Sequence, residues 1–548
     1  MRLIDLYPAQ GTFAPGETVR LVAEIEAESP AAIVVRLTIF HLASVVDTQS
    51  IPLSLVAGKQ TVSLDWQCPR ITPRGYAAEI ELIAPDGRVL GTAATAFDML
   101  DRWTQAPRYG FLTDFSPGRG NVEGTLRTLA QFHVNAVQFY DWMYRHDQLL
   151  PPASHYTDPL NRPLSLAIIR ALIESAHCHG IACMPYTAIY AASPEFYRTH
   201  PDWALFHVDG RTFEFAGGFL IYMNPAPGSP WSQHLFNQFD TVLRTLDFDG
   251  IHLDQYGDPI AARDSAGNVV ALDRAFPAFI DATVERAKAN RTDAAVVFNC
   301  VGNWPIETVS HSRADFMYIE VWKPYTLWRD LWRLVVDAQR LGNKPVVLAA
   351  YIDPAREHNV RLADALIFAS GGYHIELGEP GGMLADPYFP KYGQMSDALR
   401  AVMRAYYDFA VRYENVLALG VRDATRDWPG RVTIDGVSTD FEQTRDIVWP
   451  IVREGNGFAT ISLINLLGIA SPEWTEALPA GPTPLGPVTV RVHLDHPIVK
   501  VWWASPDGHS PQAIPVPAQT GRDAHGDYLN IALPGLMCWT LIVLEWER

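Results

Sequence analysis

The stretch Gly250-Ile251-His252-Leu253-Asp254 is a short apolar run that ends in a carboxylate. Three other short apolar runs precede it and four follow it, and longer helical patterns separate these runs. This alternation is typical of βα units that surround a parallel sheet. The eight predicted strands are 109–113, 136–140, 182–186, 250–254, 294–299, 316–320, 345–351 and 372–377.

The segments between these runs have the apolar spacing of amphipathic helices. Only the fifth connection, near 305–311, is too short to predict a helix. Eight repeats in about 300 residues favour a (β/α)8 TIM barrel, because a doubly wound open sheet usually stops at about five to seven strands. The predicted helices are 122–132, 164–179, 231–246, 272–288, 326–341 and 361–368.

Both ends of the chain instead show short strands of alternating polarity, separated by turns that contain Pro and Gly. The N-terminal strands, with a Pro-Asp-Gly turn at 85–87, predict an immunoglobulin-like β-sandwich. A closing helix at 394–413 precedes a predicted C-terminal β-sandwich. We therefore expect a multidomain chain with domains at 1–103, 104–415 and 416–548. The flanking strands are predicted at 18–24, 33–40, 60–66, 76–83, 432–434, 458–463, 488–494, 499–503, 528–533 and 538–544.

The composition is that of a folded globular protein, with 48% hydrophobic and 19% charged residues among 548. The net charge of −18 would repel a phosphate backbone, so nucleic acid is not an expected partner. The five cysteines are scattered without CxxC spacing, so we expect buried free thiols rather than disulfides or a zinc site. We expect no metal site and no cofactor.

The first residues lack a basic segment followed by an apolar one, and no stretch is long and apolar enough to span a membrane. We therefore expect a cytoplasmic location and no membrane partner. A substrate that is a long polymer would instead require an exported enzyme.

Polar and aromatic residues stand at the C-terminal ends of the predicted strands, which line the active site in TIM barrels. A purely structural barrel would not need so many ionisable groups there, because burying each without a partner costs roughly several kcal/mol. The strand ends carry Asp114, Tyr140, Asp141, Trp142, Tyr186, Asp254, Asn299, Glu320, Trp322, Tyr351, His374 and Glu376.

Carboxylates and aromatics, without a triad serine, a Gly-rich phosphate loop or a His-rich cluster, are typical of sugar chemistry. Aromatic faces stack on pyranose rings, and a pair of carboxylates cleaves the glycosidic bond. One carboxylate attacks or stabilises the anomeric carbon, and the other supplies a proton to the leaving oxygen. The candidates are Asp114, Asp141, Asp254, Asp258, Glu320 and Glu376.

Several segments together resemble glycoside hydrolase family 66, and the resemblance spans the whole predicted barrel. The family contains endo-dextranases and cycloisomaltooligosaccharide glucanotransferases, which act on α-1,6-glucan with retention of configuration. The segments are Tyr109-Gly110-Phe111-Leu112-Thr113-Asp114-Phe115, Phe139-Tyr140-Asp141-Trp142-Met143-Tyr144-Arg145-His146, Gly250-Ile251-His252-Leu253-Asp254-Gln255-Tyr256-Gly257-Asp258, Tyr318-Ile319-Glu320-Val321-Trp322, His374-Ile375-Glu376-Leu377-Gly378 and Asp386-Pro387-Tyr388-Phe389-Pro390.

The resemblance implies that Asp254 is the nucleophile and Glu320 the acid/base. It further implies that the segment from Tyr140 to His146 clamps the sugar to be transferred. We predict substrate contacts at Asp114, Tyr140, Asp141, Trp142, Arg145, His146, Tyr186, Asp258, Asn299, Trp322, Lys323, His374, Glu376 and Tyr388.

Structural roles for these residues stay open at this point. Asp141 either contacts substrate or supports Arg145, whereas Asp114 and Asp258 either touch sugar or hold a loop. The aromatic residues, which also include Trp304 and Tyr325, either line subsites or belong to the core.

We predict a dextranase-like retaining hydrolase of α-1,6-glucosidic bonds in dextran or isomaltooligosaccharides, with transglycosylation as a side reaction. In the family, cyclising members typically carry an extra module inserted into the barrel, and the gap at 188–249 leaves no room for one. The alternatives are a cycloisomaltooligosaccharide glucanotransferase, a hydrolase of another α-glucoside, and a non-catalytic α-glucan-binding barrel. A pure binder would have no need to retain both carboxylates.

Overall fold

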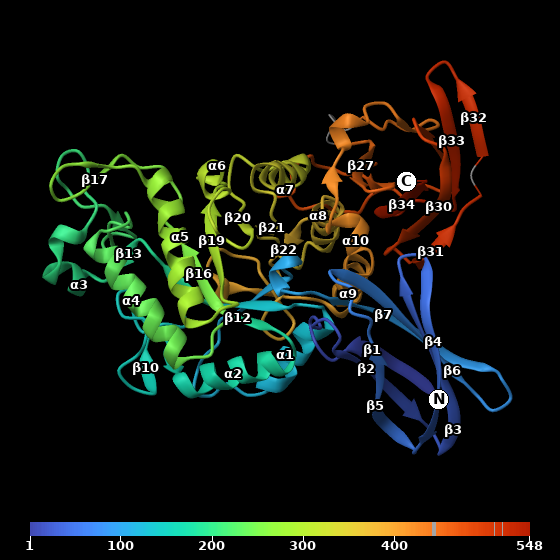
Figure 1. Cartoon of the computed structure of the whole chain (residues 1–548), viewed down its shortest axis with the longest axis horizontal. Helices are drawn as coiled ribbons and strands as arrows, with labels where there is room; N and C mark the ends of the chain where they lie inside the picture. The colour runs from blue at the N-terminus through green and yellow to red at the C-terminus, as the bar shows by residue number, and fades with distance from the viewer. Residues whose placement is uncertain (441–444, 509, 518, 548) are drawn as a thin grey trace.

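The computed structural model describes residues 1–440, 445–508, 510–517 and 519–547, and its centre is a sheet of eight parallel strands (Figure 1). The strand order is β22-β21-β20-β19-β16-β12-β9-β8, which is the reverse of the chain order. Each predicted strand corresponds to one of them. The strands are β8 Tyr109–Leu112, β9 Ala136–Phe139, β12 Ala182–Ala188, β16 Gly250–Asp254, β19 Ala295–Val301, β20 Met317–Glu320, β21 Val346–Ala349 and β22 Tyr373–His374.

The first and last strands meet, so the sheet is a nearly closed barrel. The Phe111 amide donates to the Leu377 carbonyl over 3.0 Å. Gly110 is needed at this seam, because a Cβ there would lie 2.7 Å from the same carbonyl oxygen. Helices connect the strands, and the fifth connection, which was too short to predict a helix, contains the four-residue α6. The helices are α1 Val122–Gln131, α2 Leu166–Cys178, α4 Pro230–Thr245, α5 Leu272–Asn290, α6 Ile306–Val309, α7 Trp328–Gly342, α8 Glu357–Ala369, α9 Asp397–Arg412 and α10 Glu414–Leu417.

Short helices and strands lie within the connections at the mouth of the barrel and after its last strand. They include a three-stranded sheet and three two-stranded hairpins. The elements are β10 His155–Thr157, β11 Pro163–Ser165, β13 Ala191–Ala192, α3 Pro194–Thr199, β14 Glu214–Phe215, β15 Leu220–Tyr222, β17 Ala262–Arg263, β18 Val269–Val270, β23 Gly382–Met383 and β24 Gly393–Gln394.

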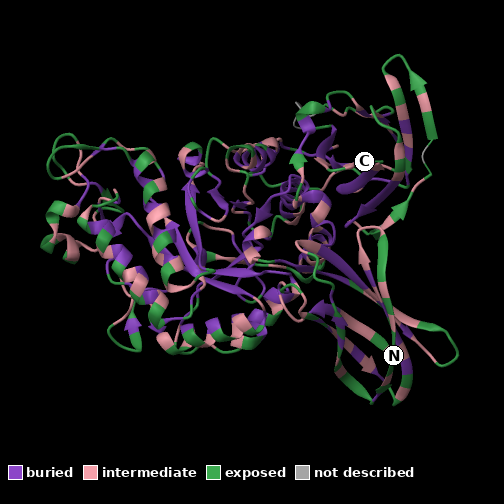
Figure 2. Ribbon diagram, in the orientation of Figure 1, coloured by how far each residue is buried: buried purple, intermediate pink, exposed green. Residues whose placement is uncertain are grey.

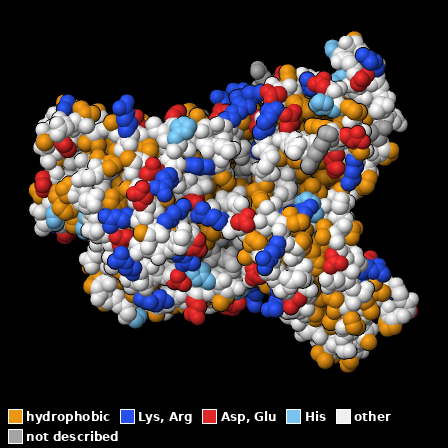
Figure 3. Space-filling model, viewed as in Figure 1, with side chains coloured by type: hydrophobic (Ala, Val, Ile, Leu, Met, Phe, Trp, Pro, Cys, Tyr) orange, Lys and Arg blue, Asp and Glu red, His pale blue; other side chains and the backbone are white. Residues whose placement is uncertain are grey.

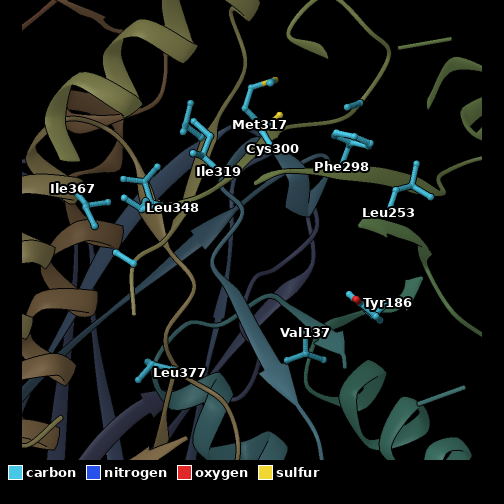
Figure 4. Close-up of a cluster of buried hydrophobic side chains, with 14 of the residues drawn as sticks. Val137, Tyr186, Leu253, Phe298, Cys300, Met317, Ile319, Leu348, Ile367 and Leu377 are labelled. Atoms are coloured by element: carbon cyan, nitrogen blue, oxygen red, sulfur yellow. The ribbon is translucent and has the colours of Figure 1, made fainter. Parts of the chain in front are cut away.

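Alternation along each barrel strand separates two apolar layers. One layer fills the barrel interior and includes Val297, Tyr318 and Val347. The other lies between strands and helices, and Figure 4 shows part of it, including Ile319 and Leu348. Figure 2 shows that the barrel strands are buried along their length. The alternation decides which side chains at a strand end point into the barrel.

The N-terminal region consists of two antiparallel sheets, ordered β1-β2-β5 and β4-β3-β6-β7, around a core of their own. The four strands predicted here are present, and the turn at 85–87 has Gly87 at a φ of 85°. Three strands were not predicted: β1, β4 and β7. The strands are β1 Arg2–Pro8, β2 Thr18–Ala27, β3 Ala31–His41, β4 Ser44–Leu55, β5 Gly58–Gln67, β6 Arg74–Ile83 and β7 Val89–Met99.

The C-terminal region also consists of two antiparallel sheets, ordered β25-β27-β28-β34-β30-β31 and β26-β29-β33-β32. All six strands predicted here are present. The strands are β25 Arg422–Asp423, β26 Val432–Ile434, β27 Val448–Gly455, β28 Phe458–Asn465, β29 Val488–His493, β30 Ile498–Ser505, β31 Ser510–Pro515, β32 Gln519–Asp523, β33 Gly526–Leu533 and β34 Trp539–Trp546.

Ion pairs join both flanking regions to the barrel, and the first of them is buried on both sides. Arg108, directly before β8, contacts Asp98 at the end of β7 over 2.7 Å, and Arg361 on α8 contacts Asp507 over 2.6 Å. The domain boundaries at 103/104 and 415/416 stay predictions, as does the immunoglobulin-like type of the first region.

Figure 3 shows basic and acidic side chains on the same face, with several basic side chains gathered near its upper middle. The five cysteines are free, and four are buried as expected. Cys178, at the end of α2, is exposed, so its predicted burial is wrong. No helix among the described residues is long and apolar enough to cross a membrane.

Candidate active site

Side chains from neighbouring strands converge inside the mouth of the barrel. The alternation that places Ile251 and Leu253 of β16 in the outer layer turns Asp254 inward. In the same way Glu320 and Asn299 face the interior, because Ile319, Phe298 and Cys300 belong to the outer layer. Tyr140, Tyr186 and Tyr351 follow the same parity. The sequence therefore brings two of the predicted carboxylates to one point.

One amide nitrogen links the two carboxylates. Asn299 Nδ2 lies 2.9 Å from Asp254 Oδ1 and 3.0 Å from Glu320 Oε2. Since both distances start at the same nitrogen, the two oxygens cannot be more than about 5.9 Å apart. If each oxygen accepts one of the two amide hydrogens, which diverge by about 120°, their separation is about 5.1 Å.

Each carboxylate also has a tyrosine of its own. Tyr186 donates to Asp254 Oδ2 and Tyr351 donates to Glu320 Oε1, each over 2.7 Å. All four carboxylate oxygens therefore accept a hydrogen bond. This fixes the orientation of both groups and leaves their remaining lone pairs for substrate.

Burial dominates the acidity of the pair. Burial and then the charge of Glu320 raise the pKa of Asp254 to about 7, against the opposing hydrogen bonds from Tyr186 and Asn299. Burial also raises the pKa of Glu320, and hydrogen bonds from Tyr351, Asn299 and Trp322 oppose it. Two close, buried carboxylates cannot both ionise easily, so the pair holds one proton near neutral pH. One protonated and one ionised carboxyl is the state that general acid catalysis beside a nucleophile requires.

A buried aromatic layer lies beneath the pair. His252 stacks against Tyr109 and Tyr186 and contacts Tyr318 edge-on. Its Nδ1 lies 3.0 Å from the Tyr109 hydroxyl, and burial lowers its pKa to about 3. His252 is therefore neutral and forms part of the packed layer beneath Asp254 and Glu320.

One side of the mouth is built from Tyr140, Asp141 and Tyr388. The Tyr140 ring stacks on Phe389, with centroids 4.4 Å apart, and contacts Tyr186 and Tyr388. Asp141 has a φ of 52°, a left-handed conformation that aspartate tolerates better than most residues. Burial raises its pKa to about 7, although the nearby Arg162 opposes this.

The alternative role considered for Asp141, support of Arg145, is wrong. The cation beside its carboxylate is Arg162, at 3.7 Å from Oδ2, and Arg162 also donates to the Asp141 carbonyl. Arg145 instead donates to the carbonyls of Tyr144 and Thr157 and lies over the Tyr144 ring.

Two further members of this segment belong to the interior rather than to the mouth. Trp142 has no exposed surface, packs edge-on against Phe248 and donates to the Tyr186 carbonyl. His146 is buried, and this burial lowers its pKa to about 4. The structure argues against the substrate contacts predicted for both, because no face of Trp142 is accessible and His146 is 7% exposed.

His374 and Glu376 point away from the pair. Tyr373 and Ile375 belong to the layer inside the barrel, so their alternating neighbours project outward towards the helices. His374 contacts Asp364 on α8, and Glu376 accepts from Tyr407 on α9. The substrate contacts predicted for His374 and Glu376 conflict with this placement.

The remaining predicted contacts lie at the rim. Asp114, Asp258, Trp322 and Lys323 are exposed, and Trp322 contacts Tyr351 edge-on. Asp114 Oδ1 accepts from the Ser116 amide, so it also holds its own loop. Trp304 and Tyr325 were predicted either to line subsites or to belong to the core. In the structure Trp304 packs beside Tyr256, and the Tyr325 hydroxyl accepts a hydrogen bond from Asn303.

Three site residues were not among the predicted contacts. Tyr190 lies beyond β12. Burial, and then the charges of Asp254, Asp141 and Glu320, raise its pKa. Tyr190 follows Tyr186 at an even spacing, so the alternation could have indicated it. Arg162 and Glu379 carry no such signal. Glu379 is buried, pairs with Arg119 over 2.7 Å and accepts from the amides of Thr113 and Asp114.

Two side-chain clusters among the described residues have the donor types of metal sites. They are His177 with Cys183 and Asp249, and Asp364 with His374 and Glu376. In the first, Asp249 already accepts from His177 and from the Cys183 amide. In the second, His374 lies within hydrogen-bond distance of both carboxylates.

The chain is similar to known proteins along most of its length. A family model described as glycosyl hydrolase family 66 matches residues 9–543. Two cycloisomaltooligosaccharide glucanotransferases of Niallia circulans are 26% and 25% identical to this chain, with alignments that cover 98% of it and 71% and 72% of the relatives. A dextranase of Streptococcus salivarius is 22% identical, covering 93% of this chain and 72% of the relative.

A solved structure has the same fold along the whole chain. It is a cycloisomaltooligosaccharide glucanotransferase of Paenibacillus sp., complexed with cycloisomaltoheptaose. The TM-score is 0.91 at 24% identity, and the match covers 99% of each chain.

Proposed function

The chain belongs to glycosyl hydrolase family 66, and we propose that it cleaves α-1,6-glucosidic bonds in dextran or isomaltooligosaccharides with retention of configuration. In this proposal Asp254 is the nucleophile and Glu320 the acid/base. The relatives named glucanotransferase and dextranase support a glycosidase acting on α-glucans.

The hydrogen bonds of Asn299 to both carboxylates carry the proposal. Retaining glycosidases hold their two carboxyls about 5–5.5 Å apart, whereas inverting enzymes need about 6.5–9.5 Å to admit a water. The upper limit of about 5.9 Å between Asp254 Oδ1 and Glu320 Oε2 leaves no space for that water between these oxygens. The spacing therefore favours a covalent intermediate.

The two steps follow from this arrangement. The Asp254 carboxylate attacks the anomeric carbon while protonated Glu320 gives its proton to the departing glycosidic oxygen. A glucosyl ester on Asp254 and a free hydroxyl on the leaving sugar result. In the second step the Glu320 carboxylate takes a proton from water, the water oxygen bonds to the anomeric carbon, and Asp254 is released.

The groups around the pair support these roles. The hydrogen bonds from Tyr186 and Asn299 stabilise ionised Asp254. Burial raises the pKa of both carboxyls, so the pair retains a proton, which this proposal assigns to Glu320. Tyr140 and Tyr388 present aromatic rings on one side of the mouth, where a pyranose ring could stack.

Chain length relative to two of the glucanotransferases supports water as the acceptor in the second step, whereas the solved glucanotransferase structure, matched over 99% of both chains, does not. The alignments with the two glucanotransferases run over 702 and 704 residues, so those relatives contain inserted sequence that this chain of 548 lacks. Between β12 and β16 the described chain contains only β13–β15, α3, a short 3-10 helix (Pro201–Trp203) and α4. The second candidate is a glucanotransferase, which the higher identity to those relatives favours.

Product analysis tests the proposal. The protein is incubated with dextran, pullulan and isomaltooligosaccharides, and the products are sized by mass spectrometry. We expect linear isomaltooligosaccharides from dextran and no cleavage of maltose-type linkages. Mainly cyclic products would establish the glucanotransferase instead, and absence of cleavage in all three would overturn the proposal.

A further inference from the structure

Behind the last barrel strand lies a fully buried polar cluster that the proposed chemistry does not use. It consists of His374 on β22, Asp364 on α8, Glu376 after β22 and Tyr407 on α9, each at most 3% exposed. His374 Nδ1 lies 2.9 Å from Asp364 Oδ1 and 3.2 Å from Glu376 Oε2. Tyr407 donates to the other oxygen of Glu376 over 2.9 Å. Asp364 and Glu376 therefore contact the imidazole on its Nδ1 side, and Tyr407 holds Glu376 in place.

The opposite edge of the imidazole reaches the backbone of the neighbouring strand. His374 Nε2 lies 2.9 Å from the Ala350 carbonyl oxygen, directly after β21. A carbonyl oxygen only accepts, so Nε2 carries a hydrogen and donates it. On the other side, Nδ1 faces only carboxylate oxygens. Burial alone would lower the pKa of His374, but Glu376 and Asp364 raise it well above its ordinary value, so both ring nitrogens are donors.

The peptide group that accepts this bond leads directly to the acid/base. The Ala350 carbonyl and the Tyr351 amide belong to one planar unit, so holding the carbonyl fixes where the Tyr351 side chain starts. Tyr351 then turns into the barrel and donates to Glu320 Oε1 over 2.7 Å. Only one residue therefore separates the buried cluster from a hydrogen bond to Glu320.

We propose that His374 is a positioning residue for the acid/base Glu320, acting through the Ala350 carbonyl and the Tyr351 hydroxyl. The inference rests on the proposed catalytic roles. Tyr351 and Asn299 occupy one site on each Glu320 oxygen, so the proton for the leaving group has only the remaining lone pairs. A displaced Tyr351 would misdirect that proton, and small misplacements of catalytic groups are costly.

Two conservative substitutions separate this role from simple packing. In H374N the side-chain amide nitrogen overlays His Nδ1, so the bonds to Asp364 and Glu376 persist and the donor to Ala350 is lost. In H374Q the amide nitrogen overlays His Nε2, so the donor to Ala350 persists and the bonds to the carboxylates weaken. Both variants remove part of the buried imidazole ring, and each keeps the half of the contacts that the other loses.

The readout is the dependence of kcat/KM on the leaving group, because kcat/KM reports the first step alone and not the second step, in which Glu320 acts as a base. The full-length protein is assayed with isomaltooligosaccharides, whose leaving sugar needs a proton, and with a dinitrophenyl α-isomaltooside, whose phenolate leaves without one. We expect H374N to lose roughly 10- to 100-fold in kcat/KM on the oligosaccharide, with less than about threefold change on the aryl substrate, because only general acid catalysis of the first step is impaired. H374Q should keep the wild-type ratio of the two kcat/KM values.

A double variant tests the route through Tyr351. H374N added to Y351F should cost less than about twofold beyond Y351F alone, because the group that His374 positions is already absent. Should H374N fail to fold, H374N/D364N provides the same comparison, because it also lacks the donor to Ala350 and removes one of the two buried carboxylates that lose the imidazole. D364N alone keeps the donor to Ala350 and should behave like H374Q.

The outcomes distinguish the inference from the function on which it rests. If the wild-type protein cleaves neither substrate, the proposed function fails. If the wild type cleaves both and H374N slows them equally, or if H374N and H374Q exchange their effects, His374 has only a structural role. Additive losses in the double variant would also overturn the inference.

Discussion

Asp254 and Glu320 share a hydrogen-bond donor, the side-chain amide nitrogen of Asn299, at 2.9 Å and 3.0 Å. This contact fixes the spacing of two carboxylates that would otherwise repel each other. It also places a neutral donor where a cation would hold both groups ionised. The pair can therefore keep one proton, as acid catalysis beside a nucleophile requires.

Substitution of Asn299 should affect turnover more than binding. In N299A both carboxylates lose a donor, and we expect kcat to fall roughly 100-fold. N299D adds a third acid to the cluster and should be at least as damaging. Steady-state kinetics on isomaltooligosaccharides measure this, with circular dichroism as the check of folding. An N299D enzyme within about threefold of wild-type kcat would contradict the role of the amide.

The two tyrosines should move opposite limbs of the pH profile. Asp254 must be ionised to attack, so kcat/KM falls as pH drops through its pKa. Tyr186 donates to this carboxylate and lowers the pKa. In Y186F the pKa of Asp254 rises, and the acid limb should move to higher pH by about one pH unit.

Glu320 must be protonated, so kcat/KM falls as pH rises through its pKa. Tyr351 lowers that pKa, so Y351F should move the alkaline limb to higher pH by a similar amount. The two variants are each other's control, since each removes one phenol hydroxyl from one carboxylate. If Y186F moves the alkaline limb and Y351F the acid limb, the catalytic roles are exchanged.

The eight barrel strands could be predicted from sequence because they depend on local patterns, whereas the choice of Asp254 and Glu320 among six candidate carboxylates came from the resemblance to the family and stays a prediction. Apolar runs such as 250–254 mark buried strands, and a polar residue at the end of such a run lies at the mouth of a barrel. The prediction for His374 and Glu376 was wrong because the strand-end rule was applied without the alternation. Tyr373 and Ile375 are both apolar and face inward, which leaves their neighbours facing outward.

Other features depend on contacts that no local pattern records. Arg162 follows β10 and contacts Asp141 across a loop. Glu379 follows the last barrel strand and pairs with Arg119, which follows the first strand and is distant only in sequence. Trp142 lies in a segment that was predicted to clamp the sugar, yet its ring packs in the core beside Phe248. A motif alone could not separate a residue that contacts sugar from one that supports its neighbours.

Two tryptophans provide a test of that distinction. Trp142 is fully buried, so W142A should lower the free energy of unfolding by about 3–5 kcal/mol. Trp322 is 42% exposed at the rim, so W322A should change stability by less than about 1 kcal/mol and instead raise KM. Urea denaturation and steady-state kinetics of both variants measure the contrast. A stable W142A with a raised KM would restore the predicted substrate contact for Trp142.

The central claim is that Asp254 forms a covalent bond to glucose at a pair spaced for retention. The most direct measurement is to trap the intermediate with 5-fluoro-α-glucosyl fluoride and identify the labelled peptide by mass spectrometry. We predict a fluoroglucosyl ester on Asp254 in the wild type and no label in D254N. A label on Glu320, or turnover without any labelled peptide and with inversion at the anomeric carbon, would contradict the account.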